Sequence, residues 1–131
     1  MEFQYEKITP TTIRPIIPIY LHFKGNLYGY KALIDSGADN NIFHADIGRV
    51  LGLKIETGKL YKFGGIKSAP LVNGYVHKVE LEVGKDKYLC DVVFSDHISD
   101  NGFGILGQVG FFDRYRVEFN YKKEIVRLTK S

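Results

Sequence analysis

The sequence predicts an all-β domain, either a small barrel or a sandwich. Short segments of alternating apolar and polar residues follow one another at close spacing, and glycine-containing turns separate several of them. At most one or two short helices are expected, and the strand–helix–strand alternation that builds a parallel sheet is missing from the sequence. With 131 residues the chain has room for one domain, which we expect at residues 16–131 behind an N-terminal arm at residues 1–15.

The arm leads into a predicted β-hairpin. Residues 1–15 are mostly polar, which favours an arm or an edge strand. Residues 18–24 place alternate apolar side chains on one face, and Gly25 with Asn26 gives a two-residue turn signal. We expect the second strand of this hairpin to end at Asp35.

A short helix is predicted after the hairpin. Phe43, Ile47 and Leu51 recur at four-residue intervals, which is the spacing of one helix face. Gly48 lowers the helix propensity of this segment. The candidate ends of the helix are Asn40 or Asn41 as the N-terminal cap and Gly52 as the stop.

The rest of the chain predicts further strands in pairs. Residues 59–63 are extended up to the break at Gly64-Gly65, and residues 75–83 alternate cleanly between apolar and charged side chains. A turn at residues 84–86 then leads to a strand over residues 88–94. The last expected strands are residues 114–119 and 124–128.

Composition narrows the functional classes. Lys and Arg exceed Asp and Glu by only 18 to 15, and the charges are interspersed, so we expect no nucleic-acid partner. No run approaches the roughly 18 apolar residues of a membrane span, and the N-terminus lacks an apolar signal core, so we expect no membrane partner and a cytoplasmic location. The single cysteine, Cys90, lies in an apolar run and is expected to be a small buried hydrophobe.

Residues 102–107 read GFGILG and fit the dinucleotide-binding fingerprint G-x-G-x-x-G. That fingerprint has a mechanism only where a strand precedes the glycines and a helix N-terminus follows them. Here a polar loop precedes Gly102, and the 24 residues after Gly107 read as strands. We therefore interpret the match as coincidental.

Three other features stand out in their order along the chain. In ALIDSGADN, residues 32–40, an apolar strand ends at a carboxylate that a hydroxyl and a glycine follow. FGGI, residues 63–66, is a candidate mobile hairpin tip. ILG, residues 105–107, places two apolar residues and a glycine after an exposed loop. Each feature alone is also compatible with an ordinary turn or loop.

Taken together, these features resemble the retropepsin-like aspartic proteases, the single-domain retroviral-type family, and in particular its cellular, non-viral members. ALIDSGA is similar to that family's active-site loop, FGGI to its flap, and ILG to the segment that packs beside the active-site loop. The resemblance covers residues 16–128. It implies a small closed acid-protease-like barrel with one or two short helices, and a short helix followed by a last hairpin in the tail.

The resemblance also implies an aspartic endopeptidase that is active as a homodimer. Peptide hydrolysis by this route needs two carboxylates, and the chain contains one Asp-Ser-Gly motif. Asp35 from each subunit would therefore meet on a two-fold axis. Such a pair shares one proton and titrates as a unit, which favours activity on the acidic side of neutrality.

The resemblance assigns roles to the neighbouring residues. Ser36 would hydrogen-bond across the dimer axis, and Gly37 would let the backbone approach the carboxylates. The flap would close over an extended peptide or protein substrate and exclude water. The expected substrate-binding residues are Ala38, Asp39, Gly64, Gly65, Ile66, Ile105, Leu106 and Gly107.

The chain departs from the retroviral pattern at two places. Retroviral members often carry an arginine directly after the ILG-type glycine, paired with the aspartate that matches Asp39, whereas this chain has Gln108. We therefore expect the dimer to be held differently or more weakly. The terminal segments are also hard to match, since residues 1–15 are longer than expected and the C-terminus is polar, so either terminus is a candidate interface.

Two alternative functions remain open at this point. The first is a peptide-binding dimer of the same fold with weak or no catalysis, and the second is a small barrel that binds nucleic acid. We expect neither a metal nor an organic cofactor. The acidic loop lacks metal-ligand spacing, and its potential ligands are Asp91, Asp96, His97 and Asp100.

Overall fold

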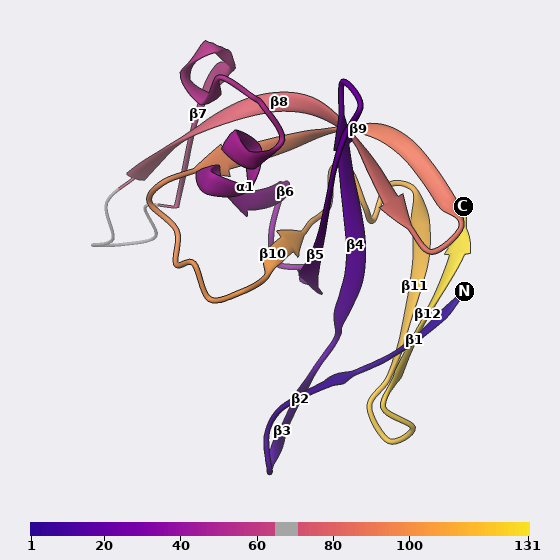
Figure 1. Cartoon of the computed structure of the whole chain (residues 1–131). Coiled ribbons are helices and arrows are strands. Elements are labelled where there is room, and N and C mark those ends of the chain that lie inside the picture. The colour runs from indigo at the N-terminus through magenta and orange to yellow at the C-terminus, as the bar shows by residue number, and fades with distance from the viewer. Residues whose placement is uncertain (65–70) are drawn as a thin grey trace.

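The computed structural model describes residues 1–64 and 71–131, which form mostly strands (Figure 1). The strands are β1 (Glu2–Gln4), β2 (Glu6–Thr9), β3 (Thr12–Arg14), β4 (Ile16–Phe23), β5 (Asn26–Ile34), β6 (Asn41–His44), β7 (Lys59–Gly64), β8 (Leu71–Val83), β9 (Asp86–Ser95), β10 (Gly104–Leu106), β11 (Tyr115–Asn120) and β12 (Ile125–Lys130). The helices are α1 (Ala45–Val50) and a 3₁₀ turn at Ile55–Thr57.

A closed barrel forms the body of the molecule. Its strands follow the order β4-β5-β10-β6-β9-β8, and a second pairing between β4 and β8 closes the ring. Strand β7 extends the sheet outside the ring by pairing with β8. Closure leaves no free edge within the ring itself, which limits pairing with other chains. The predicted all-β barrel with short helices is confirmed.

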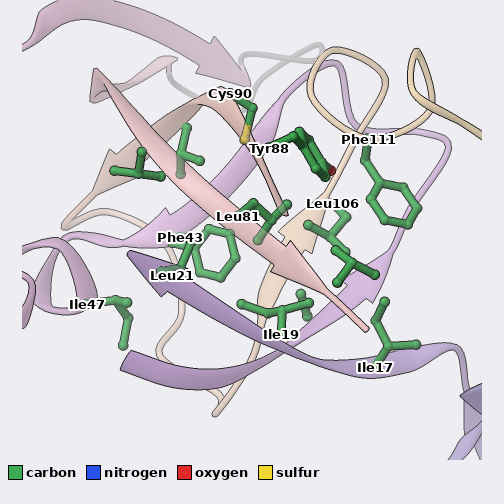
Figure 2. Close-up of a cluster of buried hydrophobic side chains, with 14 of the residues drawn as sticks. Ile17, Ile19, Leu21, Phe43, Ile47, Leu81, Tyr88, Cys90, Leu106 and Phe111 are labelled. Carbon is green, nitrogen blue, oxygen red and sulfur yellow. The ribbon is translucent and has the colours of Figure 1, made fainter. Parts of the chain in front are cut away.

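Strands whose side chains alternate between the inside and the outside supply the core of the barrel (Figure 2). In β4, the side chains of Ile17, Ile19 and Leu21 are buried, while Tyr20 between them is half exposed. The same alternation buries every second residue in the second half of β8, as the sequence predicts. Burying one such aliphatic side chain contributes about 1.5–3 kcal/mol to folding. The inward-facing residues of β8 are Val79, Leu81 and Val83.

Two-residue turns set the register of the long hairpins. The β4–β5 turn is Lys24-Gly25, one residue earlier than expected, because Phe23 pairs with Asn26. Both turn residues have positive φ, 46° and 84°, as the tight hairpin turn with right-handed strand twist requires. The β8–β9 turn is likewise shorter than predicted, since Asp86 already pairs with Val83.

The predicted helix at residues 41–52 is only half correct. Asn41–His44 form strand β6 between β9 and β10, and the helix begins at Ala45. The N-terminal cap is therefore His44 and neither Asn40 nor Asn41, since the His44 ring Nδ1 accepts from the Asp46 N–H at 3.1 Å. The first apolar residues of this segment are buried between strands, so pairing overrides the helical spacing.

The helix itself packs through its glycine. A Cβ at Gly48 would lie 2.6 Å from Ile55 Cδ1 and 3.0 Å from the Phe94 ring. The glycine that weakens the helix thus lets it lie close against the core. Gly52, with φ of 94°, ends the helical turn as predicted.

The N- and C-terminal strands form a separate sheet in the order β1-β12-β11. The Met1 ammonium donates to the Leu128 carbonyl, and Leu128 N–H donates back to Met1, each at 2.8 Å. Strands β2 and β3 form a small hairpin of their own. The segment between β10 and β11 forms one isolated bridge, from Val109 to Asn40, and otherwise turns, so the short helix that the resemblance implied there is not formed.

Candidate active site

Asp35 lies where β5 leaves the barrel. Its N–H donates to the Leu106 carbonyl of β10 at 2.9 Å, so the strand pairing extends to the aspartate backbone. Its half-buried carboxylate accepts from Gly37 N–H through Oδ1 at 2.9 Å. Ala38 N–H closes the turn by donating to the Asp35 carbonyl at 3.2 Å. These bonds fix the direction of the carboxylate relative to the loop that carries it.

The ILG segment holds this loop from the other side. Strand β10 runs parallel to β5, with Ile105 opposite Leu33 and Leu106 opposite Ile34. The chain after β10 continues the pairing, because Gln108 and Val109 donate their N–H groups to the carbonyls of residues 38 and 39 at 2.8 and 2.9 Å. The predicted contact between this segment and the Asp35 loop is present. The roles of Ile105 and Leu106 in a peptide pocket stay a prediction.

Gln108, which stands where retroviral members carry arginine, makes a different contact. Its side-chain Nε2 donates to the Ser36 carbonyl at 2.6 Å. The amide therefore holds the loop at the residue next to Asp35, whereas the arginine of the retroviral pattern pairs with an aspartate. Ser36 itself is exposed.

Asn41 is a site residue that the sequence analysis missed. Its side chain is fully buried, its Oδ1 accepts from Gly107 N–H at 3.0 Å, and its Nδ2 contacts Cys90 Sγ at 3.7 Å. A buried amide with both ends bonded joins β6, β9 and the end of β10 in a fixed arrangement. Burial raises the pKa of the Cys90 thiol to about 11, so this cysteine is a neutral packing residue, as expected.

Replacing Gly107 with alanine is expected to destabilise the protein by about 1–3 kcal/mol, the usual cost of overpacking. A Cβ there would lie 2.4 Å from the Asn40 carbonyl oxygen and 2.6 Å from that of Ala38, and both are backbone atoms that cannot turn aside. Urea unfolding measures the change. The matched control is Gly29→Ala, whose Cβ would meet only the side chain of Tyr20 at 3.0 Å. Equal stability of the two variants would contradict the expectation.

Strands β7 and β8 form a hairpin beside the Asp35 loop, and a flap role for this hairpin stays a prediction. Strands β7 and β8 pair from Lys59–Val76 to Gly64–Leu71. Gly64 has φ of 84°, a conformation that favours glycine. The Asn40 amide donates to the Tyr61 hydroxyl at 2.9 Å and ties the hairpin to the segment after Asp35. The other predicted flap residues, Gly65 and Ile66, lie outside the described residues.

Among the described residues, potential metal ligands come together at one place, which joins Asp100 of the acidic loop to two residues at the start of α1. Ligand atoms of His44, Asp46 and Asp100 lie within 4.8 Å of one another. The His44 ring nitrogen Nδ1 already caps helix α1. In the acidic loop itself, Asp96 forms a bidentate ion pair with Arg49, and the hydrogen bonds from Arg49 lower the pKa of Asp96. Of the other two cluster members, Asp46 pairs with Arg49 at 2.9 Å and Asp100 accepts from the Tyr30 hydroxyl at 3.3 Å.

In residues 1–64 and 71–131, none of the helices has the length and apolar character that crossing a membrane would need.

Solved structures of known proteins resemble this chain. A retropepsin-like aspartic protease from Rickettsia conorii matches with a TM-score of 0.65 and 16% identity, over 98% of this chain and 89% of that one. EIAV protease complexed with an inhibitor matches with a TM-score of 0.52 and 17% identity, over 78% of this chain and 88% of that one. No protein-family profile and no curated protein matches the sequence. With its closed barrel and the β10 segment bound to the Asp35 loop, the chain has the retropepsin-like fold.

Proposed function

We propose that this chain is an aspartic endopeptidase that works as a homodimer, with Asp35 as the catalytic residue of each subunit. The observation that carries the proposal is the position of Asp35 in a retropepsin-like fold. It stands at the end of β5, on a loop that β10 and its continuation hold through backbone hydrogen bonds. The exposed Ser36 and Gly37 beside it leave that loop accessible to a partner and to a peptide.

The chemistry follows from two carboxylates that share one proton. The ionised carboxylate accepts a proton from a water molecule, whose oxygen attacks the peptide carbonyl carbon. The protonated carboxylate donates its proton to the carbonyl oxygen, so a neutral tetrahedral diol forms. The diol collapses when the protonated carboxyl gives its proton to the nitrogen, the C–N bond breaks, and a diol hydroxyl returns its proton to the ionised carboxylate, so that the pair again shares one proton. Neither a metal nor an organic cofactor is needed for these steps.

The remaining site residues bind and cover the substrate in this proposal. Ser36 of each loop hydrogen-bonds across the two-fold axis and keeps the aspartates at a fixed distance. An extended peptide binds through main-chain hydrogen bonds, and its alternate side chains enter apolar pockets. The β7–β8 hairpin closes over it. The residues proposed to contact substrate are Ala38, Asp39, Gly64, Gly65, Ile66, Ile105, Leu106 and Gly107.

The proposal also includes the domain organisation, the partners and the location of the protein. Residues 16–131 form the protease domain and residues 1–15 its N-terminal arm. The partners are a second copy of the chain and a peptide or protein substrate, and the setting is the cytoplasm.

Cleavage of a mixed peptide library should depend steeply on chain concentration. If only the dimer is active, the rate per chain rises with concentration until the dimer saturates. The rate should be highest at acidic pH within about 4 to 7 and fall toward neutrality, because the shared proton is lost. Peptide binding without cleavage at saturating concentration would instead support the weakly catalytic peptide-binding dimer.

A further inference from the structure

The Asp35 carboxylate depends on one peptide group of its own loop. Within the residues that the structure describes, the one hydrogen bond to this carboxylate comes from the Gly37 N–H, at 2.9 Å from Oδ1. That N–H belongs to the peptide group between Ser36 and Gly37, whose other end is the Ser36 carbonyl. The orientation of this peptide group therefore decides whether the carboxylate keeps its donor.

This peptide group is the centre of a β-turn that is compatible with two forms. The Ala38 N–H donates to the Asp35 carbonyl at 3.2 Å, which closes the four-residue turn. Neither Ser36 nor Gly37 has a positive φ, so among the common turn types this is type I. A type II turn turns the central peptide over and requires a positive φ at the third residue, which glycine adopts readily. Because the third residue is Gly37, the turn alone does not keep the N–H on Asp35.

Gln108 holds the other end of the same peptide group. Its side-chain Nε2 donates to the Ser36 carbonyl at 2.6 Å. A carbonyl oxygen only accepts, so the amide nitrogen must face it. The backbone of Gln108 is anchored as well, since its N–H donates to the Ala38 carbonyl at 2.8 Å. It follows directly after β10, which lies beside β5 in Figure 1. Turning the central peptide over would break the side-chain bond.

We propose that Gln108 is a positioning residue for Asp35, whose amide fixes the central peptide of the turn at residues 35–38 in the orientation that presents the Gly37 N–H to the carboxylate. The inference rests on the proposed function, in which Asp35 is the catalytic group. Gln108 acts through the loop and contacts no reacting atom. A catalytic group that is held in one orientation does not have to be reoriented before each reaction.

Amide NMR of Gln108→Met tests the orientation with a readout that needs no activity. Methionine is unbranched and of similar length, but it has no donor. The Gly37 amide proton resonance should move upfield, because this proton loses its charged acceptor. It should move by more than the resonance of Ala38, whose bond both turn types keep. The matched control is Gln4→Met at an exposed residue of β1, which should leave both resonances unchanged.

Peptide cleavage tests the consequence for catalysis. At chain concentrations where the rate per chain no longer rises, Gln108→Met should lower kcat by a factor of about two to ten, which corresponds to the usual net contribution of one hydrogen bond. KM should stay the same, because the side chain binds the loop and not the substrate. A purely structural contact would change the urea midpoint but neither the Gly37 resonance nor the kcat of the folded enzyme.

The outcomes separate the positioning role from the function. If the wild type cleaves peptide and Gln108→Met alters neither the Gly37 resonance nor kcat, the positioning role is overturned while the protease stands. A moved resonance with an unchanged kcat also overturns it, since the bond would then not serve catalysis. A raised KM at an unchanged kcat overturns it as well, because Gln108 would then bind substrate. If the wild type cleaves no peptide at any concentration, the proposed function fails and the positioning role fails with it.

Discussion

Replacing Asp35 with asparagine is expected to lower kcat/KM for peptide cleavage by a factor of about 10² to 10⁴, which is the usual contribution of general acid–base catalysis. Asparagine keeps the shape of the side chain, and its oxygen can still accept from Gly37 N–H. It can neither take a proton from water nor share one with a partner. Urea unfolding should accordingly show little change in the free energy of unfolding. The lost activity would then be due to the chemical step and not to unfolding.

The matched control for Asp35→Asn is Asp46→Asn, which removes the same charge from an exposed residue of helix α1. This control should cleave peptide at the wild-type rate. If Asp35→Asn retained full activity while the control did too, Asp35 would not be the catalytic group. The proposal of an aspartic endopeptidase would then fail, and only the retropepsin-like fold would remain.

Mixing the inactive variant with the wild type tests whether two copies act together. When all chains are dimeric and exchange freely, wild-type pairs form in proportion to the square of the wild-type fraction. Activity at fixed wild-type concentration should then fall to about one half with an equal amount of Asp35→Asn, and to about one eleventh with a tenfold excess. Activity that does not change on mixing would show that each chain acts alone.

Local sequence signals predicted most of the strands. Alternation fixed the faces of β4 and β8, and the positions of glycine indicated the tight turns to within one or two residues. The error at residues 41–44 has a physical reason. Four-residue apolar spacing is compatible with a helix, but it also arises when a buried strand runs directly into a helix, as at Phe43 and Ile47. Only the pairing with β9 and β10 distinguishes the two.

Contacts between distant segments could not be predicted from local patterns. Nothing in the local sequence around Asn41 indicates that its amide binds Gly107, 66 positions away. Likewise, nothing around Gln108 indicates that its side chain binds Ser36, 72 positions away. The occupied edges of β12 also depend on the meeting of the first and last strands. The motif resemblance predicted the retropepsin-like fold and the position of the ILG segment beside the Asp35 loop. The hydrogen bonds that join those segments become visible only in the folded chain.

The junction between the terminal sheet and the barrel depends on one buried carboxylate. Asp86, at the start of β9, is 9% exposed and accepts from Arg114 Nε and Nη2 at 2.8 and 2.9 Å. The Tyr115 hydroxyl and the Lys130 ammonium also contact it, at 2.5 and 3.2 Å. The Arg114 guanidinium in turn lies 4.1 Å above the Tyr88 ring. These contacts fasten β11 and β12 to the β8–β9 hairpin.

Asp86→Asn should therefore lower the free energy of unfolding by about 1–3 kcal/mol at pH 7, since Arg114, whose side chain is one third exposed, loses its charged partner. Urea unfolding at fixed chain concentration measures the change. The matched control is Asp91→Asn on the same strand, whose pair with Lys78 is exposed and should be worth less than about 1 kcal/mol. Equal effects of the two substitutions would contradict this account.

The pH dependence of this pair links stability to the proposed chemistry. The hydrogen bonds from Arg114, chiefly, hold the pKa of Asp86 below its ordinary value of 3.8, against the opposing effect of burial. A carboxyl whose pKa is lower in the folded state stabilises the fold fully above the unfolded pKa, and the stabilisation is lost as pH falls through the folded one. The difference between wild type and Asp86→Asn should thus stay constant from pH 7 to about 5 and shrink only below about 4. A difference already lost at pH 5 would contradict the assignment, because a carboxyl with a lowered pKa is still ionised at that pH. If the assignment holds, the terminal sheet stays attached over the acidic range in which a proton-sharing Asp35 pair would work.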